Sequence, residues 1–272
     1  MMGINTHHID GYFCMRSLYM KGESMQNKLI HIPHSSQFIP EEFRKLFLID
    51  NKTLERELLI MTDNYCDDMF DVSGIEKVIF PISRLICDVE RFTDKEKEIM
   101  NRVGMGVCYE KTHDLKNLKI ANLKHELEIL KKYYYPHHKT LTNKVSKILE
   151  MHKNCIIFDC HSFPSKKLPY EINHTSKRPD ICIGVDDFHT PNALANSLQD
   201  YFRSLGLTVS INTPFAGSIV PLEYYKKDKN VHSVMIEVNK KLYMNEQTGE
   251  KNTNYVFIKN LIRNIIKNIE IY

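Results

Sequence analysis

Two short apolar segments of this 272-residue chain end in histidine, and together they indicate a metal site. Residues 155–158 (C-I-I-F) have the pattern of a strand buried on both faces, and they lead into Asp159 and His161. Residues 29–33 (L-I-H-I-P) form a second such run, which ends at His34. A single buried histidine is usually a hydrogen-bonded core residue, but two similar strand ends can converge at one edge of an α/β sheet. We therefore expect His34 and His161 to bind one zinc ion.

Asp63 is a candidate for a carboxylate ligand of that site. Apolar side chains recur at helical spacing over residues 53–70, and Thr62 and Asp63 interrupt the pattern. An aspartate at such a position is commonly the N-cap of the helix that follows. It could equally be a metal ligand, and the residues alone leave both interpretations open.

Glu237 is the candidate for a catalytic base. It lies within residues 233–238 (S-V-M-I-E-V), which have the pattern of a strand. Either Glu237 faces solvent, as alternation along a strand allows, or it is a buried carboxylate with a raised pKa. Only the buried alternative suits proton transfer.

Two arginines lie in or beside another apolar segment, residues 78–89. Arg84 falls inside this segment and Arg91 just after it. A buried arginine cannot lose its charge, so it must find an anionic or hydrogen-bonding partner. That partner is either a structural carboxylate, Asp88 or Glu90, or the carboxylate of a substrate, which matches the planar guanidinium group.

These residue types are sufficient for metal-assisted hydrolysis. A zinc ion acidifies a bound water molecule and polarises a carbonyl, and a nearby glutamate takes up the proton. An arginine can then stabilise the developing oxyanion.

The other segments predict an α/β fold that can bring these side chains together. Strands alternate with helices after residue 155, which predicts a three-layer α/β/α architecture with a mixed, largely parallel sheet. The predicted strands are residues 78–89 (broken at Pro81 and resumed through 85–87), 180–184 and 207–211. One helix is predicted to start at Pro40. Further helices are predicted over residues 118–149 (divided before Pro136), 193–205 and 258–269. A polar loop at 166–178 has a length that suggests a lid, and 212–217 (N-T-P-F-A-G) is a constrained turn at the expected site edge.

Composition limits the class of protein. With 42% hydrophobic and 26% charged residues, we expect one domain over residues 25–272, after a loosely ordered extension of residues 1–24. The net charge of +3 indicates no nucleic-acid partner. Seven cysteines without a C-x-x-C pair are typical of reduced thiols in a cytoplasmic protein. No apolar stretch approaches the ~20 residues that span a bilayer, so we expect no membrane partner.

Eight motifs, in order along the chain, resemble those of the N-formylglutamate amidohydrolases. They are P-H-S-S (33–36), T-D-N-Y-C-D-D-M-F (62–70), S-R-L-I-C-D-V-E-R-F (83–92), G-M-G-V-C-Y (104–109), Y-Y-Y-P-H-H (133–138), D-C-H-S-F-P (159–164), N-T-P-F-A-G (212–217) and I-E-V-N-K-K-L-Y-M (236–244). The resemblance implies a zinc carboxypeptidase-like fold with a mixed eight-stranded sheet between helices. It also implies zinc-dependent cleavage of the small molecule N-formyl-L-glutamate to formate and glutamate, a late step of one route of histidine degradation.

The resemblance also implies roles for individual residues. His34 and His161 would be zinc ligands, and Glu237 would be the base that activates water. Arg84 would polarise the substrate carbonyl, and Arg91 would hold the substrate carboxylate. Two further residues, in the turn at the site edge, are predicted to bind the substrate: Asn212 and Gly217.

Two positions depart from the expected pattern. Gln37 stands where zinc carboxypeptidases have a glutamate ligand, so Asp63 is predicted to complete the zinc site. Glu90 stands where an asparagine is expected, and an acid there would either orient Arg91 or oppose an anionic substrate. A carboxypeptidase-like peptidase acting on larger peptides and a non-catalytic binding protein of the same fold are the alternatives. The roles of two neighbouring histidines beside Pro136 are left open: His137 and His138.

Overall fold

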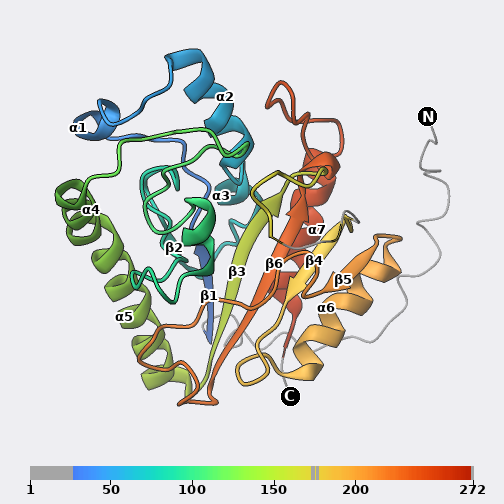
Figure 1. Ribbon diagram of the computed structural model, residues 1–272. Helices are drawn as coiled ribbons and strands as arrows, with labels where there is room; N and C mark the ends of the chain where they lie inside the picture. Colours follow the sequence, from blue (N-terminus) through green and yellow to red (C-terminus); the bar gives the residue numbers. More distant parts are fainter. Residues whose placement is uncertain (1–26, 173–174, 176–177, 271–272) are drawn as a thin grey trace.

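The computed structural model describes residues 27–172, 175 and 178–270, and its centre is a six-stranded sheet. The strands lie in the order β2-β1-β3-β6-β4-β5 (Figure 1). All neighbouring strands are parallel except β4 and β6, which are antiparallel, so the prediction of a mixed, largely parallel sheet is confirmed. The strands are β1 (Lys28–Ile32), β2 (Glu76–Ile79), β3 (Cys155–Phe163), β4 (Ile181–Gly184), β5 (Val209–Ile211) and β6 (Val231–Asn239).

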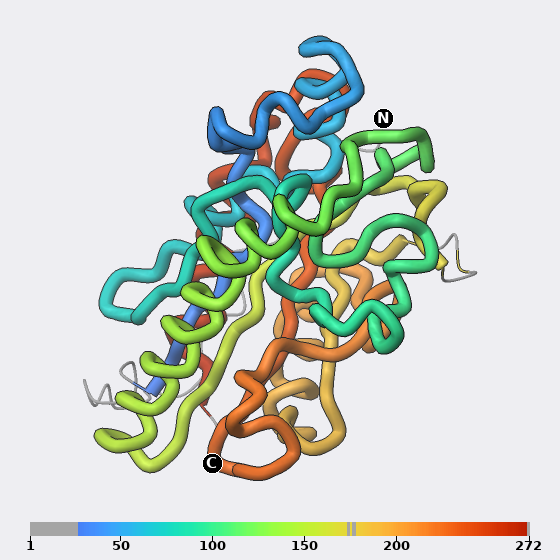
Figure 2. Tube along the Cα trace, turned by 60° about the vertical axis from the view of Figure 1, so that its left-hand side comes forward, coloured from blue at the N-terminus to red at the C-terminus, as the bar shows by residue number. Residues whose placement is uncertain are grey.

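Helices cover both faces of the sheet, which confirms the three-layer α/β/α architecture. On one face, α5 packs against β1, β2 and β3 (Figure 2). On the other face lie α6 and α7, as Figure 1 shows, and their apolar residues share a core cluster with those of β1, β3, β4 and β6. The helices are α1 (Glu41–Arg44), α2 (Asn51–Met61), α3 (Cys66–Met69), α4 (Leu123–Ile129), α5 (Tyr135–His152), α6 (Asn192–Ser204) and α7 (Tyr255–Asn268), with short 3-10 helices at Ile99–Val103 and Lys240–Leu242.

Two expectations about strands are wrong. The described residues form six strands rather than eight. In addition, residues 85–87 do not resume the strand that stops before Pro81. Proline has no amide hydrogen for the sheet ladder, and the carbonyl oxygen of Ser83 then accepts hydrogen bonds from the backbone amides of Ile86 (2.9 Å) and Cys87 (3.3 Å). These bonds close a turn, which redirects the chain over the edge of the sheet.

The long helical segment is divided before Pro136, as predicted. A π-helical turn at Leu130–Tyr134 separates α4 from α5 and places Pro136 in the first turn of α5. Proline is tolerated there because the amides of the first turn have no partner within their own helix. His137 lies in the same turn, so its side chain is buried against the sheet while the chain enters α5.

Some expectations concern residues outside the described part of the chain. The predicted extension of residues 1–24 lies there entirely, as do positions 173–174 and 176–177 of the polar loop. Six of the cysteines are described, and all six are free thiols. Among the described residues, no helix is long and apolar enough to cross a membrane.

Candidate metal centre and active site

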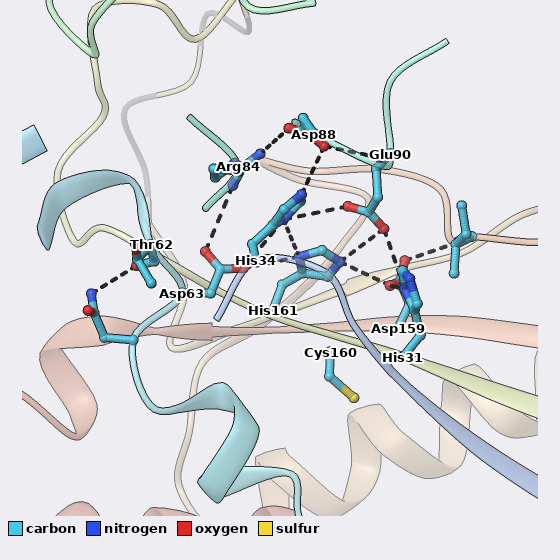
Figure 3. Close-up of polar contacts among 12 residues, drawn as sticks. His31, His34, Thr62, Asp63, Arg84, Asp88, Glu90, Asp159, Cys160 and His161 are labelled. Atoms are coloured by element: carbon cyan, nitrogen blue, oxygen red, sulfur yellow. Dashed lines mark hydrogen bonds and ion pairs between the residues drawn. The ribbon is translucent and has the colours of Figure 1, made fainter. Parts of the chain in front are cut away.

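The candidate site lies on the α5 face of the sheet, where β1, β3 and β6 end. Side chains alternate along a strand, so Asp159 and His161 of β3 point to the same face, on which Ile157 packs against α5. Glu237 pairs with His161 in the parallel ladder between β3 and β6, which puts its side chain on that face as well. His34 follows β1 by two residues. Figure 3 shows the two histidines side by side with Asp63.

His34, Asp63 and His161 form a compact group of potential metal ligands. The Nδ1 atoms of His34 and His161 are 3.3 Å apart. Oδ2 of Asp63 lies 3.1 Å from Nδ1 of His161 and 3.7 Å from Nδ1 of His34. All three side chains are buried, and one ligand atom from each lies within 4.8 Å of the others. Two imidazoles and a carboxylate are a usual protein ligand set of catalytic zinc, which leaves a position for water.

The two candidate ligand histidines each direct Nδ1 toward Asp63 and contact another carboxylate through Nε2. Nε2 of His34 lies 2.9 Å from Oδ1 of Asp88, and Nε2 of His161 lies 3.0 Å from Oδ1 of Asp159. A carboxylate can only accept a hydrogen bond, so each Nε2 carries a proton. In the neutral rings, the Nδ1 atoms then hold lone pairs that face Asp63. The donor set therefore fits a zinc ion, because ligating histidines usually donate their other N–H to a carboxylate.

A further pair of histidines extends this chain of hydrogen bonds to α5. Oδ1 of Asp159 also contacts Nδ1 of His31 (2.9 Å), and Nε2 of His31 contacts Nε2 of His137 (2.9 Å). Burial lowers the pKa of His137 to about 2, so its ring is neutral and donates Nε2–H to His31. Oδ2 of Asp159 accepts the backbone amide of Ile219 (3.0 Å). Asp159 is thus fixed from three directions.

The side chain of Asp63 does not cap a helix and faces the two histidines instead. Asp63 does not cap α3, whose N-cap is Tyr65 and has no side-chain hydrogen bond. Instead, the Asp63 backbone amide donates to the carbonyl oxygen of His34 (2.9 Å), and its carboxylate faces the histidines. Burial alone would raise the pKa of Asp63, but His161 and His34 lower it overall, so the group is an anion.

The side chain of Glu237 is buried and does not face solvent. Its residue exposure is 7%, and its Oε2 has no hydrogen-bond partner in the described part of the chain. Burial raises the pKa of Glu237 to about 8; the positive charge of His161 opposes this effect, and Asp63 adds to it. A carboxyl group with such a pKa can take up and release a proton near neutral pH.

Both arginines converge on the Asp88 carboxylate. Arg84 donates from Nη2 to Oδ2 of Asp88 (2.8 Å) and from Nε to the hydroxyl of Tyr109 (3.0 Å), and its Nη1 lies 3.9 Å from Oδ1 of Asp63. Nη2 of Arg91 lies 3.7 Å from Oδ2 of Asp88, and its buried Nε has no partner among the described residues. Arg84 is therefore fixed beside the candidate metal ligands, whereas Arg91 keeps a free donor.

Glu90 turns toward the histidines. Its Oε1 lies 3.3 Å from Nε2 of His161 and its Oε2 3.7 Å from Nδ1 of His34. Its backbone amide donates to Oδ1 of Asp88 (3.0 Å). Glu90 could thus join a metal group, either with His34 and Asp88 or with His31 and Asp159. The ion pairs of Glu90 in the described structure are with histidines, and none orients Arg91.

Comparison with known proteins assigns the chain to a family. The family model of N-formylglutamate amidohydrolase matches residues 27–244. The chain belongs to this family. A curated relative is the N-formylglutamate deformylase of Pseudomonas putida, which is 24% identical over 227 residues, or 80% of this chain and 82% of that protein. As a member of the family, the chain is a hydrolase that acts on amide bonds.

Two solved structures have the same fold. The crystal structure of N-formylglutamate amidohydrolase from Ralstonia eutropha JMP134 superposes with a TM-score of 0.74 at 20% identity, covering 88% of this chain and 91% of that one. A gene product of Agrobacterium tumefaciens superposes with a TM-score of 0.57 at 17% identity, covering 87% and 88% of the two chains. At these identities the likeness concerns the fold alone.

The turn at residues 212–217 lies beside β4 in this member of the amidohydrolase family. Oδ1 of Asn212 accepts hydrogen bonds from the backbone amides of Val185 (2.8 Å) and Gly217 (3.3 Å), so this side chain holds the turn together. Gly217 has a φ angle of 85°, in the left-handed region that favours glycine. The roles of Asn212 and Gly217 in substrate binding stay predictions.

Sequence reasoning named Asp88 only as a possible structural partner of the arginines, which the contacts of Arg84 and Arg91 bear out, and it missed His31 as part of the site. Both lie in apolar runs, and the only available signal was the cost of burying such polar groups without partners. His31 has the same strand parity as Leu29, which packs against α5, so its orientation was predictable once β1 was assigned. The position of Asp88 depends on the irregular path after Pro81, which no periodicity describes. His138 donates to the carbonyl oxygen of Val89 (2.8 Å) and packs beside the site.

Proposed function

We propose that this amidohydrolase is zinc-dependent and cleaves N-formyl-L-glutamate to formate and L-glutamate. The observation that carries the proposal is the group formed by His34, Asp63 and His161, with the buried Glu237 on the neighbouring strand. The family description and the names of the Pseudomonas putida and Ralstonia eutropha relatives support the choice of substrate.

His34, Asp63 and His161 would hold the zinc ion, which would acidify a water molecule and polarise the formyl carbonyl. Glu237 takes the proton from the attacking water as the new C–O bond forms. The same group then gives that proton to the amide nitrogen as the C–N bond breaks. The second proton of the water leaves the new carboxyl group and protonates the amine, which yields formate and the ammonium form of glutamate. The pKa of Glu237, about 8 without a metal ion, suits both transfers.

Arg84 and Arg91 would act on two different parts of the substrate, the formyl carbonyl oxygen and the α-carboxylate. Nη1 of Arg84 faces Asp63 at 3.9 Å, and it stabilises the negative charge that develops on the carbonyl oxygen. Arg91, with its Nε free of partners in the described part of the chain, binds the α-carboxylate. Asp88 holds both guanidinium groups and His34, so it fixes the relative positions of all three.

The proposal is tested by metal content and formate release. The purified protein should contain one zinc ion per chain and release formate from N-formyl-L-glutamate faster than it releases acetate from N-acetyl-L-glutamate. Removal of zinc with a chelator should abolish the activity, and zinc should restore it. A protein that purifies without metal, or whose formate release resists chelation, would disprove the zinc-dependent mechanism.

Substitution Glu237→Gln tests the assigned base. The variant should keep its zinc and its melting temperature but lose roughly 10²- to 10⁴-fold in kcat, the usual contribution of general base catalysis. Glu223→Gln is the matched control, because Glu223 is exposed on the surface. Near-normal turnover by the Glu237 variant would mean that another group accepts the proton.

A further inference from the structure

Arg178 is a buried arginine that the proposed mechanism does not use. Its side chain is 4% exposed, and its Nη2 forms an ion pair with Oε2 of Glu171, whose own side chain is 3% exposed. Within the described part of the chain, Nε and Nη1 of Arg178 are buried without a hydrogen-bond partner. Donors of a charged group that are buried without a partner destabilise the folded state. These two nitrogens carry three N–H donors, which can bind an anion.

Arg178 lies over the next side chain along the catalytic face of β3. The guanidinium carbon is 5.9 Å from the ring centre of Phe163 and 5.7 Å from that of Phe215. Phe163 follows His161 by two residues, so the two side chains point to the same face of the strand. Phe215 belongs to the turn at the edge of the site. Arg178 thus lies one side-chain position beyond the candidate metal ligand.

Contacts of Cys182 on the neighbouring strand β4 also place Arg178 near Glu237. Cys182 pairs with Glu237 between β4 and β6, and its thiol contacts the backbone oxygen of Phe215 (3.3 Å). The pKa of Cys182 is raised to about 12, mainly by burial; the charge of Glu237 raises it further and that of Arg178 lowers it. Cys182 therefore contacts Phe215, over which Arg178 lies, and is paired with the candidate base on the neighbouring strand.

Residues 170 and 171 connect Arg178 with the two arginines on the other side of the site. Burial raises the pKa of Tyr170 to about 12; the charges of Arg84 and Arg91 lower it, and that of Glu171 raises it. Tyr170 packs against the core cluster that contains Tyr109, whose hydroxyl accepts a hydrogen bond from Arg84, while the next residue, Glu171, holds Arg178. The segment that holds Arg178 is thus anchored on the side of the site where Arg84 lies.

We propose that Arg178 binds the side-chain carboxylate of the substrate, opposite the α-carboxylate on Arg91. The site then selects N-acylated amino acids with an acidic side chain. This inference rests on the proposed amidohydrolase function and goes beyond it by assigning the specificity for the side chain. Glu171 fixes the guanidinium through Nη2, and the carboxylate completes the hydrogen bonds of the remaining N–H groups.

The experiment compares two substrates of nearly the same shape, N-formyl-L-glutamate and N-formyl-L-glutamine, in the zinc-loaded protein. In the wild type, kcat/KM should be much higher for the acid. In Arg178→Gln, kcat/KM for the acid should fall by roughly 10- to 100-fold, largely through KM, because a hydrogen bond to a charged group is lost. The value for the amide should stay close to that of the wild type. Arg178→Lys should lie between, since lysine keeps the charge but not the planar geometry.

The matched control is Arg56→Gln, since Arg56 is exposed and its side chain donates to the backbone oxygen of Gln247 (2.9 Å). It should leave the ratio of the two substrates unchanged. If Arg178→Gln lowers kcat/KM equally for both substrates, or for neither, the inference is overturned and Arg178 only fastens its loop to Glu171.

Calorimetric binding of L-glutamate and L-glutamine keeps this test separate from the test of the proposed function. If the wild type releases formate from no N-formyl amino acid, the proposed function fails. Binding of L-glutamate that weakens in Arg178→Gln, with no such change for L-glutamine, would then still support a carboxylate site at Arg178. Equal binding of L-glutamate by both proteins would refute it.

Discussion

Each of the two candidate ligand histidines donates a hydrogen bond from Nε2 to a carboxylate. His34 donates to Asp88 and His161 to Asp159, so both rings present Nδ1 toward Asp63 without any need for the metal to orient them. Without a metal ion, burial opposes the charge of His161, but its carboxylate neighbours outweigh this effect and raise its pKa well above the ordinary value. A metal ion that binds at Nδ1 of His161 would therefore have to displace a proton from this ring.

Asp63 and Asp50 provide a matched pair for separating a ligand from a helix cap. Asp50 is the N-cap of α2 and accepts the backbone amide of Thr53 (2.7 Å), whereas Asp63 caps no helix. Asp63→Ala should lower the zinc affinity by more than about 10-fold, since even residues behind the ligands contribute that much. Asp50→Ala should lower the stability by about 1 kcal/mol and keep the affinity. Competition with a chelator and urea denaturation measure the two effects, and equal zinc affinity of both variants would exclude Asp63 as a ligand.

His137 tests the hydrogen-bond chain that runs from α5 to His161. His137→Leu leaves Nε2 of His31 without its buried donor, so Asp159 is held less firmly, and zinc affinity should fall by roughly 10-fold. His137→Gln should recover most of this loss, because the amide NH₂ group can donate in place of the ring. His152→Leu, on the same helix, is the control and should bind zinc like the wild type. A lower melting temperature with unchanged zinc affinity in His137→Leu would mean that this histidine only packs.

At the scale of elements, strand periodicity predicted more than loop geometry did. The apolar runs predicted strands at the positions of β3 and β6 but left open whether Glu237 faces solvent, and the register of the two strands places it on the same face as His161. The leucines of α4 show the opposite case: Leu123 and Leu127 have the spacing of a buried stripe, yet they are 68% and 57% exposed. Packing of α4 is decided by the irregular segment around residues 80–122, whose path depends on tertiary contacts and has no repeat that a sequence could reveal.

Glu57 fastens part of this irregular segment to α2. Its carboxylate accepts the backbone amide of His113 (2.6 Å) and contacts Nδ1 of the same residue (2.6 Å). The hydrogen bond to Glu57 raises the folded-state pKa of His113 above 6.5, so its stabilising effect is complete below pH 6.5 and is lost as the pH rises through the folded value. Urea midpoints of the wild type should therefore fall between pH 6 and pH 8.

The variant Glu57→Gln should lose about 1–3 kcal/mol at pH 6 and show a weaker dependence on pH. Glu55→Gln is the control, because Glu55 lies exposed on the same helix and should keep the pH dependence of the wild type. Identical pH profiles of Glu57→Gln and the wild type would contradict the assigned ion pair.

Across the whole molecule, the site depends on elements that are far apart in the sequence. Its histidines come from β1 and β3, its base from β6, and its arginines from the loop after β2. The far face of the sheet is closed by α7, whose residues Ile258, Ile262 and Ile266 pack in the same core cluster as Phe158 of β3. Attachment of this last helix is therefore part of what keeps the strands of the site in register.

Asp68 joins α3 to α7 and gives the attachment a dependence on pH. Its carboxylate accepts hydrogen bonds from the hydroxyl of Tyr255 (2.6 Å) and from Nζ of Lys259 (2.5 Å), and it lies 3.5 Å from Nη2 of Arg263. Burial alone would raise the pKa of Asp68, but Lys259 and Tyr255 lower it to about 2. The stabilisation is therefore present above the ordinary pKa of 3.8 and is lost as the pH falls through about 2.

Asp68→Asn should lower the stability by about 1 kcal/mol at pH 6, a small value because the side chain is 39% exposed and solvent screens the charges. The difference between wild type and variant should stay constant above about pH 5 and be small by about pH 2, where half of the wild-type carboxylate is protonated. Asp67→Asn is the matched control, because Asp67 is the exposed neighbour on α3 and should show no such trend. Denaturant titrations across this pH range measure the effect, and a stability gap that persists undiminished at pH 2 would show that charge does not hold α7 to α3.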